Sequence, residues 1–203
     1  MPDISLTEFV DFVVASGSPK LTKVREIKRR HRLGYEPAAD FWKRLREAIV
    51  DMHREGTPPK QLDTVIEEQT DQKKLTAYPK AVQGYRKFAG RKKWQWFDPP
   101  RATWSHHNLN IVVNPELGLV VNGKRFILKL YFKKEPKLSK RRTEAVFELM
   151  RLALEPTVMS ESTLGVLDVQ QGKLLKPGAR AANLDALLNG EALSFESIWN
   201  SLP

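Results

Sequence analysis

The hydrophobic positions of the first ninety residues follow the period of an α-helix. In residues 37–55, for example, Phe41, Leu45, Ile49 and Met52 recur at intervals of three or four. Glycine and proline interrupt the pattern repeatedly, which divides it into separate elements. The predicted helices span residues 6–15, 20–33, 37–55, 60–68 and 74–89. Pro79 fits a first turn, so it indicates that the last of these helices begins near Tyr78.

The second half of the chain changes to alternating and β-branched positions. Strands are expected at residues 109–113, 117–121 and 125–132, with Asn122 and Gly123 as a tight turn between the last two. A helix capped by Ser139 follows over residues 139–154. Two further strands and two further helices complete the prediction, at residues 164–169, 173–176, 183–188 and 193–202. Gly190 is the expected break between the last two helices.

This order predicts an α+β fold. An N-terminal helical part, residues 1–98, precedes an α/β part, residues 99–203, in which a small mixed or antiparallel sheet is flanked by helices. The central strands are expected to form a single meander. Asp98, Pro99 and Pro100 mark the best boundary between the parts, but no linker demands two units, so we expect one compact unit.

Composition narrows the class of protein. The chain has 203 residues, of which 41% are hydrophobic, and no cysteine. The lack of cysteine excludes disulfides, thiolate zinc sites and cysteine nucleophiles. No apolar run is long enough for a membrane span, and acids occupy the N-terminal positions where a signal peptide carries positive charge. We therefore expect a cytoplasmic protein with no membrane partner.

The charge balance indicates an anionic partner. Lysine and arginine number 34 against 24 acids, a net charge of +10. Such an excess favours DNA or RNA, because each phosphate contact releases bound counterions. The alternative is a solvated basic surface that only keeps the protein soluble.

Two basic runs are candidates for that contact. The first combines three cations with two tryptophans that could stack on bases: Arg91, Lys92, Lys93, Trp94 and Trp96. Its alternative is that the tryptophans belong to the core. The second run is Lys133, Lys134, Lys140, Arg141 and Arg142. Its last three cations would oppose the dipole of the helix that they begin, which indicates an anion nearby. The arginines of residues 29–32 would extend this face if they fold onto the same side.

Within residues 75–170, Pro115 and Glu116 precede one predicted strand and Lys129 lies on the next, an arrangement that resembles the core of the PD-(D/E)XK nuclease superfamily. Pro115 and Glu116 stand where that family has Pro-Asp at its second strand, and Lys129 stands where its third strand carries lysine. Ile127 occupies the position of the second acid. The resemblance implies an αβββαβ core that acts on nucleic acid.

The same resemblance implies a metal-dependent nuclease only if further carboxylates are found. Its chemistry needs at least two carboxylates on Mg²⁺ or Mn²⁺. Glu116 could be joined by Glu144 or Glu148 of the following helix, with Asp168 as another donor, and Glu116, Lys129 and Glu144 would then be catalytic. The alternative is that Glu144 and Glu148 lie on a solvated helix face and that Glu116 is a turn residue.

Three functions therefore remain open. The first is nucleic-acid binding by a basic face on an inactive or eroded nuclease-like fold. The second is a metal-dependent nuclease, which leaves enzymatic activity undecided. The third is a protein–protein module whose basic face docks on an acidic partner.

Overall fold

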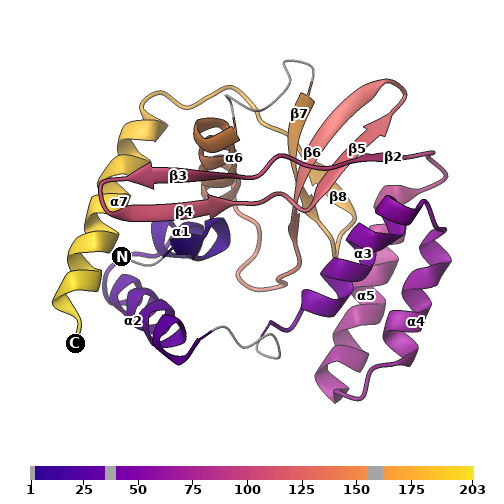
Figure 1. Cartoon of the computed structure of the whole chain (residues 1–203), viewed down its shortest axis with the longest axis horizontal. Helices are drawn as coiled ribbons and strands as arrows, with labels where there is room; N and C mark the ends of the chain where they lie inside the picture. The colour runs from indigo at the N-terminus through magenta and orange to yellow at the C-terminus, as the bar shows by residue number, and fades with distance from the viewer. Residues whose placement is uncertain (1–2, 35–39, 155–161) are drawn as a thin grey trace.

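The secondary structure is that of an α+β protein (Figure 1). The computed structural model describes residues 3–34, 40–154 and 162–203. The helices are α1 (Leu6–Val13), α2 (Ser18–Leu33), α3 (Lys43–Glu55), α4 (Leu62–Glu67), α5 (Gln72–Ala89), α6 (Lys140–Leu154) and α7 (Leu184–Ser201), with a 3₁₀ turn at Pro59–Gln61. The strands are β1 (Asp3–Ser5), β2 (Gln95–Phe97), β3 (Ala102–His106), β4 (Leu109–Val113), β5 (Leu117–Val121), β6 (Lys124–Tyr131), β7 (Ser162–Asp168) and β8 (Lys173–Leu175).

The strands form two sheets, which corrects the prediction of a single meander. The larger sheet has the order β2-β5-β6-β7-β8, in which β6 and β7 are parallel and the other pairs antiparallel. The smaller sheet has the order β1-β4-β3, with β1 parallel to β4. The chain crosses between the sheets at Asn114 and Pro115, so β4 does not pair with β5. Proline cannot donate to a continuing ladder, which favours this break.

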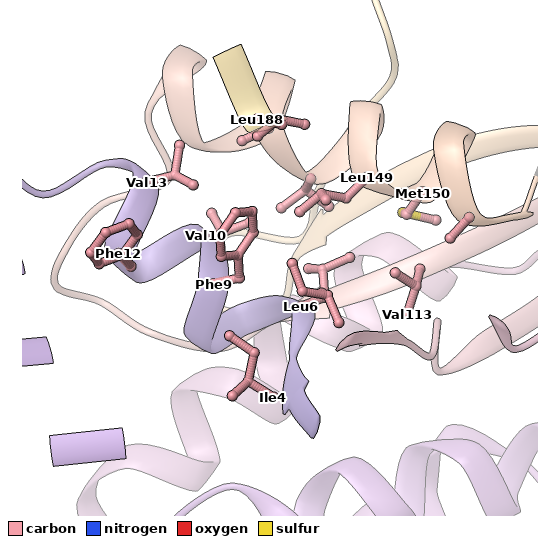
Figure 2. Packing of buried hydrophobic residues seen from close by; sticks show 14 of the residues in the cluster. Ile4, Leu6, Phe9, Val10, Phe12, Val13, Val113, Leu149, Met150 and Leu188 are labelled. Carbon is pink, nitrogen blue, oxygen red and sulfur yellow. The ribbon is translucent and has the colours of Figure 1, made fainter. Parts of the chain in front are cut away.

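Two hydrophobic clusters cover opposite faces of the larger sheet, because successive side chains of a strand point to opposite faces. In β6, Phe126 and Leu128 enter a cluster with α3, α4 and α5, whereas Ile127 and Tyr131 enter a cluster with α1 and α6. The second of these clusters also contains α2, α7 and the smaller sheet. Figure 2 shows α1 side chains, among them Phe9, reaching into it beside α6 and α7.

Three predicted helix boundaries differ from the structure. Helix α5 begins at Gln72 and includes Pro79, because the Asp71 side chain accepts hydrogen bonds from the Lys73 and Lys74 amides and so starts the helix earlier. Helix α7 continues through Gly190 where two helices were expected. The expected start of α3 at residue 37 lies outside the described residues, and the helix itself begins at Lys43.

Candidate nucleic-acid interface

Glu116 and Lys129 meet where β5 begins beside β6. Lys129 Nζ lies 2.5 Å from Glu116 Oε1 and 3.2 Å from the Asn114 carbonyl oxygen, and Glu116 Oε2 accepts the Leu130 amide at 2.8 Å. Both side chains are largely buried. The pair satisfies its own charges and joins the crossover between the two sheets to β6.

The other carboxylates proposed for a metal site have different partners. Glu148 is buried and pairs with Arg180 and Arg151, and Glu144 lies 3.7 Å from Lys140. Asp168 accepts the Gln171 amide at 3.0 Å. In the part of the chain that the structure describes, no three His, Cys, Asp or Glu side chains gather to hold a metal ion. The set of Glu116, Glu144 and Glu148 is therefore not brought together.

The second basic run is largely engaged with the protein's own acids. Asp11 on α1 accepts ion pairs from Lys133, at 2.7 Å, and from Arg142, which is 3% exposed. Burial alone would raise the pKa of Asp11, but the hydrogen bonds and charges of Lys133 and Arg142 lower it below its usual range. Arg141 donates to the Val13 carbonyl oxygen at 2.9 Å and lies near Glu191.

The anion expected at the first turn of α6 is thus supplied from within the chain. Lys134 and Lys140 remain exposed, with Lys140 loosely paired to Glu144. The arginines of residues 29–32 belong to α2, which lies across the molecule from α5 (Figure 1). Arg30 in this group pairs with Glu8 of α1 at 3.0 Å, and whether the group extends the second basic run stays a prediction.

Trp94 of the first run is packed rather than open, whereas Trp96 is half-buried and lines a cleft. Trp94 stacks on Phe88 at 5.3 Å between ring centroids and meets the edge of Phe126, and its indole N–H donates to the Ala89 carbonyl oxygen. Lys92 Nζ lies 5.4 Å above the Trp94 ring. Trp96 donates to Asp98, and the Arg54 guanidinium lies 5.5 Å from its ring.

The cations of the first run belong to a larger surface than the sequence pattern indicated. On α5, Lys73, Lys80 and Lys87 are all exposed and seven residues apart, which places them on one face at intervals of about 10.5 Å. Lys87 also packs against the turn at Gly172, just before β8. Lys176 Nζ, at the end of β8, lies 5.4 Å from the Phe126 ring that Trp94 contacts.

These residues together form what we call the α5–β8 basic surface. Its members are Lys73, Lys80, Lys87, Arg91, Lys92, Lys93, Lys173 and Lys176. All eight are exposed, and none forms an ion pair with a described acid. One signal in the sequence could have revealed this surface, because residues 72–97 contain no acid while lysine recurs on one face of the predicted helix.

Comparisons with known proteins identify no family for this chain. No protein-family model matches the chain, and no curated protein matches it. Among the described residues, no helix is both long and apolar enough to cross a membrane.

Proposed function

We propose that this protein binds the phosphate backbone of double-stranded nucleic acid through the α5–β8 basic surface. The observation that carries the proposal is the gathering of eight exposed cations, without an acid partner among the described residues, over α5, the loop that follows it and β8. A protein that neutralises phosphates gains affinity from the counterions it releases. Cations that are already paired within the protein cannot supply this gain in full, which is why Lys133 and Arg142 are not part of the proposed surface.

The aromatic side chains favour a duplex over a single strand. Proteins that bind single strands without sequence preference stack successive bases on open aromatic faces. Here Trp94 is stacked on Phe88, and Lys92 and Lys176 lie over Trp94 and Phe126. The surface therefore presents positive charge to the phosphate backbone of a duplex. Such contacts position the protein on the duplex but do not read its base sequence.

The resemblance to the PD-(D/E)XK nucleases supports the same class of ligand. Helix α5, strands β2, β5 and β6, helix α6 and strand β7 follow one another in αβββαβ order, with β3 and β4 inserted after the first strand. Glu116 precedes the second of these strands and Lys129 lies on the third. Ile127, at the position of the family's second acid, is buried against α6. We therefore propose binding without cleavage, on an eroded nuclease-like fold.

The test is fluorescence anisotropy with a labelled DNA duplex of about 20 base pairs at about 50 mM and about 200 mM salt, without divalent metal. The variant Lys80→Gln, Lys87→Gln, Lys173→Gln removes three charges from the surface. We expect weaker binding and a slope of log K against log salt that is shallower by about 1 for each phosphate that the variant no longer neutralises.

The matched control removes three exposed arginines of α2, which lies across the molecule (Figure 1). It carries Arg25→Gln, Arg29→Gln and Arg32→Gln, and it should bind nearly as the unaltered protein does. Equally weakened binding in both variants would mean diffuse attraction to the net charge of +10 rather than a site. Absence of binding at the lower salt concentration would refute the proposal and favour an acidic protein partner. Tighter binding to a single strand of the same length would refute the duplex assignment.

A further inference from the structure

A cleft of about 780 Å³ opens beside the Glu116–Lys129 pair, and the proposed duplex contact does not use it. Its walls come from α3, from the connection between β2 and β3, and from the crossover before β5. The volume falls within the range of about 300–1,000 Å³ typical of small-molecule sites. Asp98, Pro99 and Arg101, which line it, come directly after β2.

Most of the charged side chains that line the cleft already have partners. The pairs are Glu116 with Lys129, Asp51 with Arg54, Glu47 with Lys43 and Arg46 with Asp40. Arg101 is exposed and has no ion pair with a described acid. Asp98 accepts the Trp96 indole N–H at 3.3 Å and has no cationic partner within the described chain. With respect to the described residues, Arg101 and Asp98 are therefore available to a ligand in the cleft.

The same wall has an apolar part. Trp96, Val50 and Pro99 line the cleft together, and the Arg54 guanidinium lies 5.5 Å from the Trp96 ring. A flat ring of a ligand can pack on such a wall, with guanidinium and indole groups as neighbours. Arg101 can then donate to a phosphate, and Asp98 can accept from an exocyclic amino group.

Nucleotides of adenine, cytosine and guanine carry a flat ring, a phosphate and an exocyclic amino group, and the cleft lies close to the α5–β8 basic surface. Strand β2 is at the edge of its sheet and connects the loop that ends at Lys93 to Asp98. About five residues separate the two, a distance of at most about 17 Å along the chain. A duplex held on the basic loop can therefore reach the cleft with a strand end or an extruded base.

We propose that this cleft takes one unpaired nucleotide of the bound nucleic acid, with a preference for bases that carry an amino group. The inference rests on the proposed function, because the basic surface delivers the strand. The base packs against Trp96, the phosphate contacts Arg101, and the amino group donates to Asp98.

The experiment compares matched DNA duplexes in the anisotropy assay, using the full chain. One duplex is blunt, one ends in a short cytidine tail, one in a thymidine tail, and one carries an internal unpaired cytidine. The cytidine-bearing probes should bind about tenfold more tightly than the blunt duplex, as one packed base can provide. The thymidine tail should gain less, because thymine has no amino group.

Variants assign the gain to the cleft. Arg101→Ala should remove the gain for all tails, and Asp98→Ala should remove the difference between cytidine and thymidine. Arg101 is exposed and Asp98 lies in a loop, so neither change should lower the melting temperature appreciably. The control Arg29→Ala should leave every ratio unchanged.

The outcomes separate the two proposals. Blunt binding without any gain from an unpaired nucleotide, or a gain that survives both variants, would overturn the cleft assignment and leave the duplex surface standing. A gain with tails but not with the internal cytidine would support the cleft for strand ends and overturn it for extruded bases. Failure of every probe to bind would overturn both proposals.

Discussion

His53 on α3 is a titratable side chain inside the cluster that α3, α4 and α5 form against the larger sheet. It is 8% exposed, and a hydrogen bond joins its Nε2 to the Tyr85 hydroxyl of α5. Burial lowers the pKa of His53 to about 4 and raises the pKa of Tyr85. Both groups are therefore neutral near pH 7, as desolvation requires.

We expect this histidine to make the protein less stable in mild acid. In the unfolded chain the imidazole binds a proton below about pH 6.5, whereas the folded chain binds it only below about pH 4. The free energy of unfolding should therefore fall as the pH falls through this window, by about 3 kcal/mol in total. Denaturant unfolding of the unaltered protein and of His53→Gln, at about pH 7 and about pH 4.5, measures the difference.

The glutamine variant cannot titrate in this range, so its stability should fall by about 2 to 3 kcal/mol less between the two pH values. It will start from a lower stability because it perturbs the bond to Tyr85, and only the pH-dependent part is compared. Equal decreases in the two proteins would show that His53 is not the group responsible.

Asp11 illustrates what could not be predicted at the scale of single residues. Its partners Lys133 and Arg142 lie 122 and 131 positions away along the chain. No local pattern in the sequence therefore indicated that Asp11 neutralises these two cations. Glu116 and Lys129, which the family resemblance named as candidate catalytic residues, form an ion pair with each other, and their catalytic role stays a prediction.

Two glycines inside helices differ in the space that is available for a side chain. A Cβ at Gly84 of α5 would lie 2.2 Å from the Val169 carbonyl oxygen and 2.5 Å from that of Gln170. The helix thus packs directly on the backbone that follows β7. Gly190 of α7 has no described atom within 4 Å of such a Cβ.

Alanine should therefore change stability in opposite directions at the two positions. Gly84→Ala must push α5 away from the sheet, and we expect a decrease of more than about 2 kcal/mol in the free energy of unfolding. Gly190→Ala should stabilise the protein by about 0.5–1 kcal/mol, because alanine loses less backbone entropy in a helix. Urea unfolding of the two variants tests this. Destabilisation by Gly190→Ala would contradict a continuous α7.

At the scale of elements, strong local sequence signals were sufficient to predict individual turns and helix starts. Asn122 and Gly123 predicted the turn between β5 and β6, and Ser139 predicted the start of α6, where its hydroxyl accepts the Arg142 amide at 3.2 Å. Strands β1 and β2 have three residues each, too few to show an alternating pattern. Strand β4 pairs with β3, its neighbour in the chain, and with β1, which lies far away in the chain, rather than with β5.

At the scale of the whole molecule, the larger sheet separates two clusters and the charges are distributed unevenly around them. The acids Asp11 and Glu191 pair with Lys20 of α2 and with Arg141 and Arg142 of α6, whereas α5 carries lysines and no acid of its own. The fold class and net charge were predictable from composition and pattern. The cleft was not, because its lining combines three segments that only the folded chain brings together.

Because α1 and α2 contact α7, we expect the hydrophobic cluster around α1 to form later during synthesis on the ribosome than the cluster around α5. Lys20 pairs with Glu191, 171 positions later, and the Phe12 and Phe195 rings lie 5.2 Å apart. The cluster around α1 therefore cannot be completed until α7 has left the exit tunnel, whereas the cluster around α5 needs nothing beyond β8.

Nascent chains stalled at increasing lengths and treated with protease should gain protection in α3–α5 first and in α1 last. The chain's first helix would then be the part that depends longest on chaperones, and protection of α1 before α7 emerges would contradict this order.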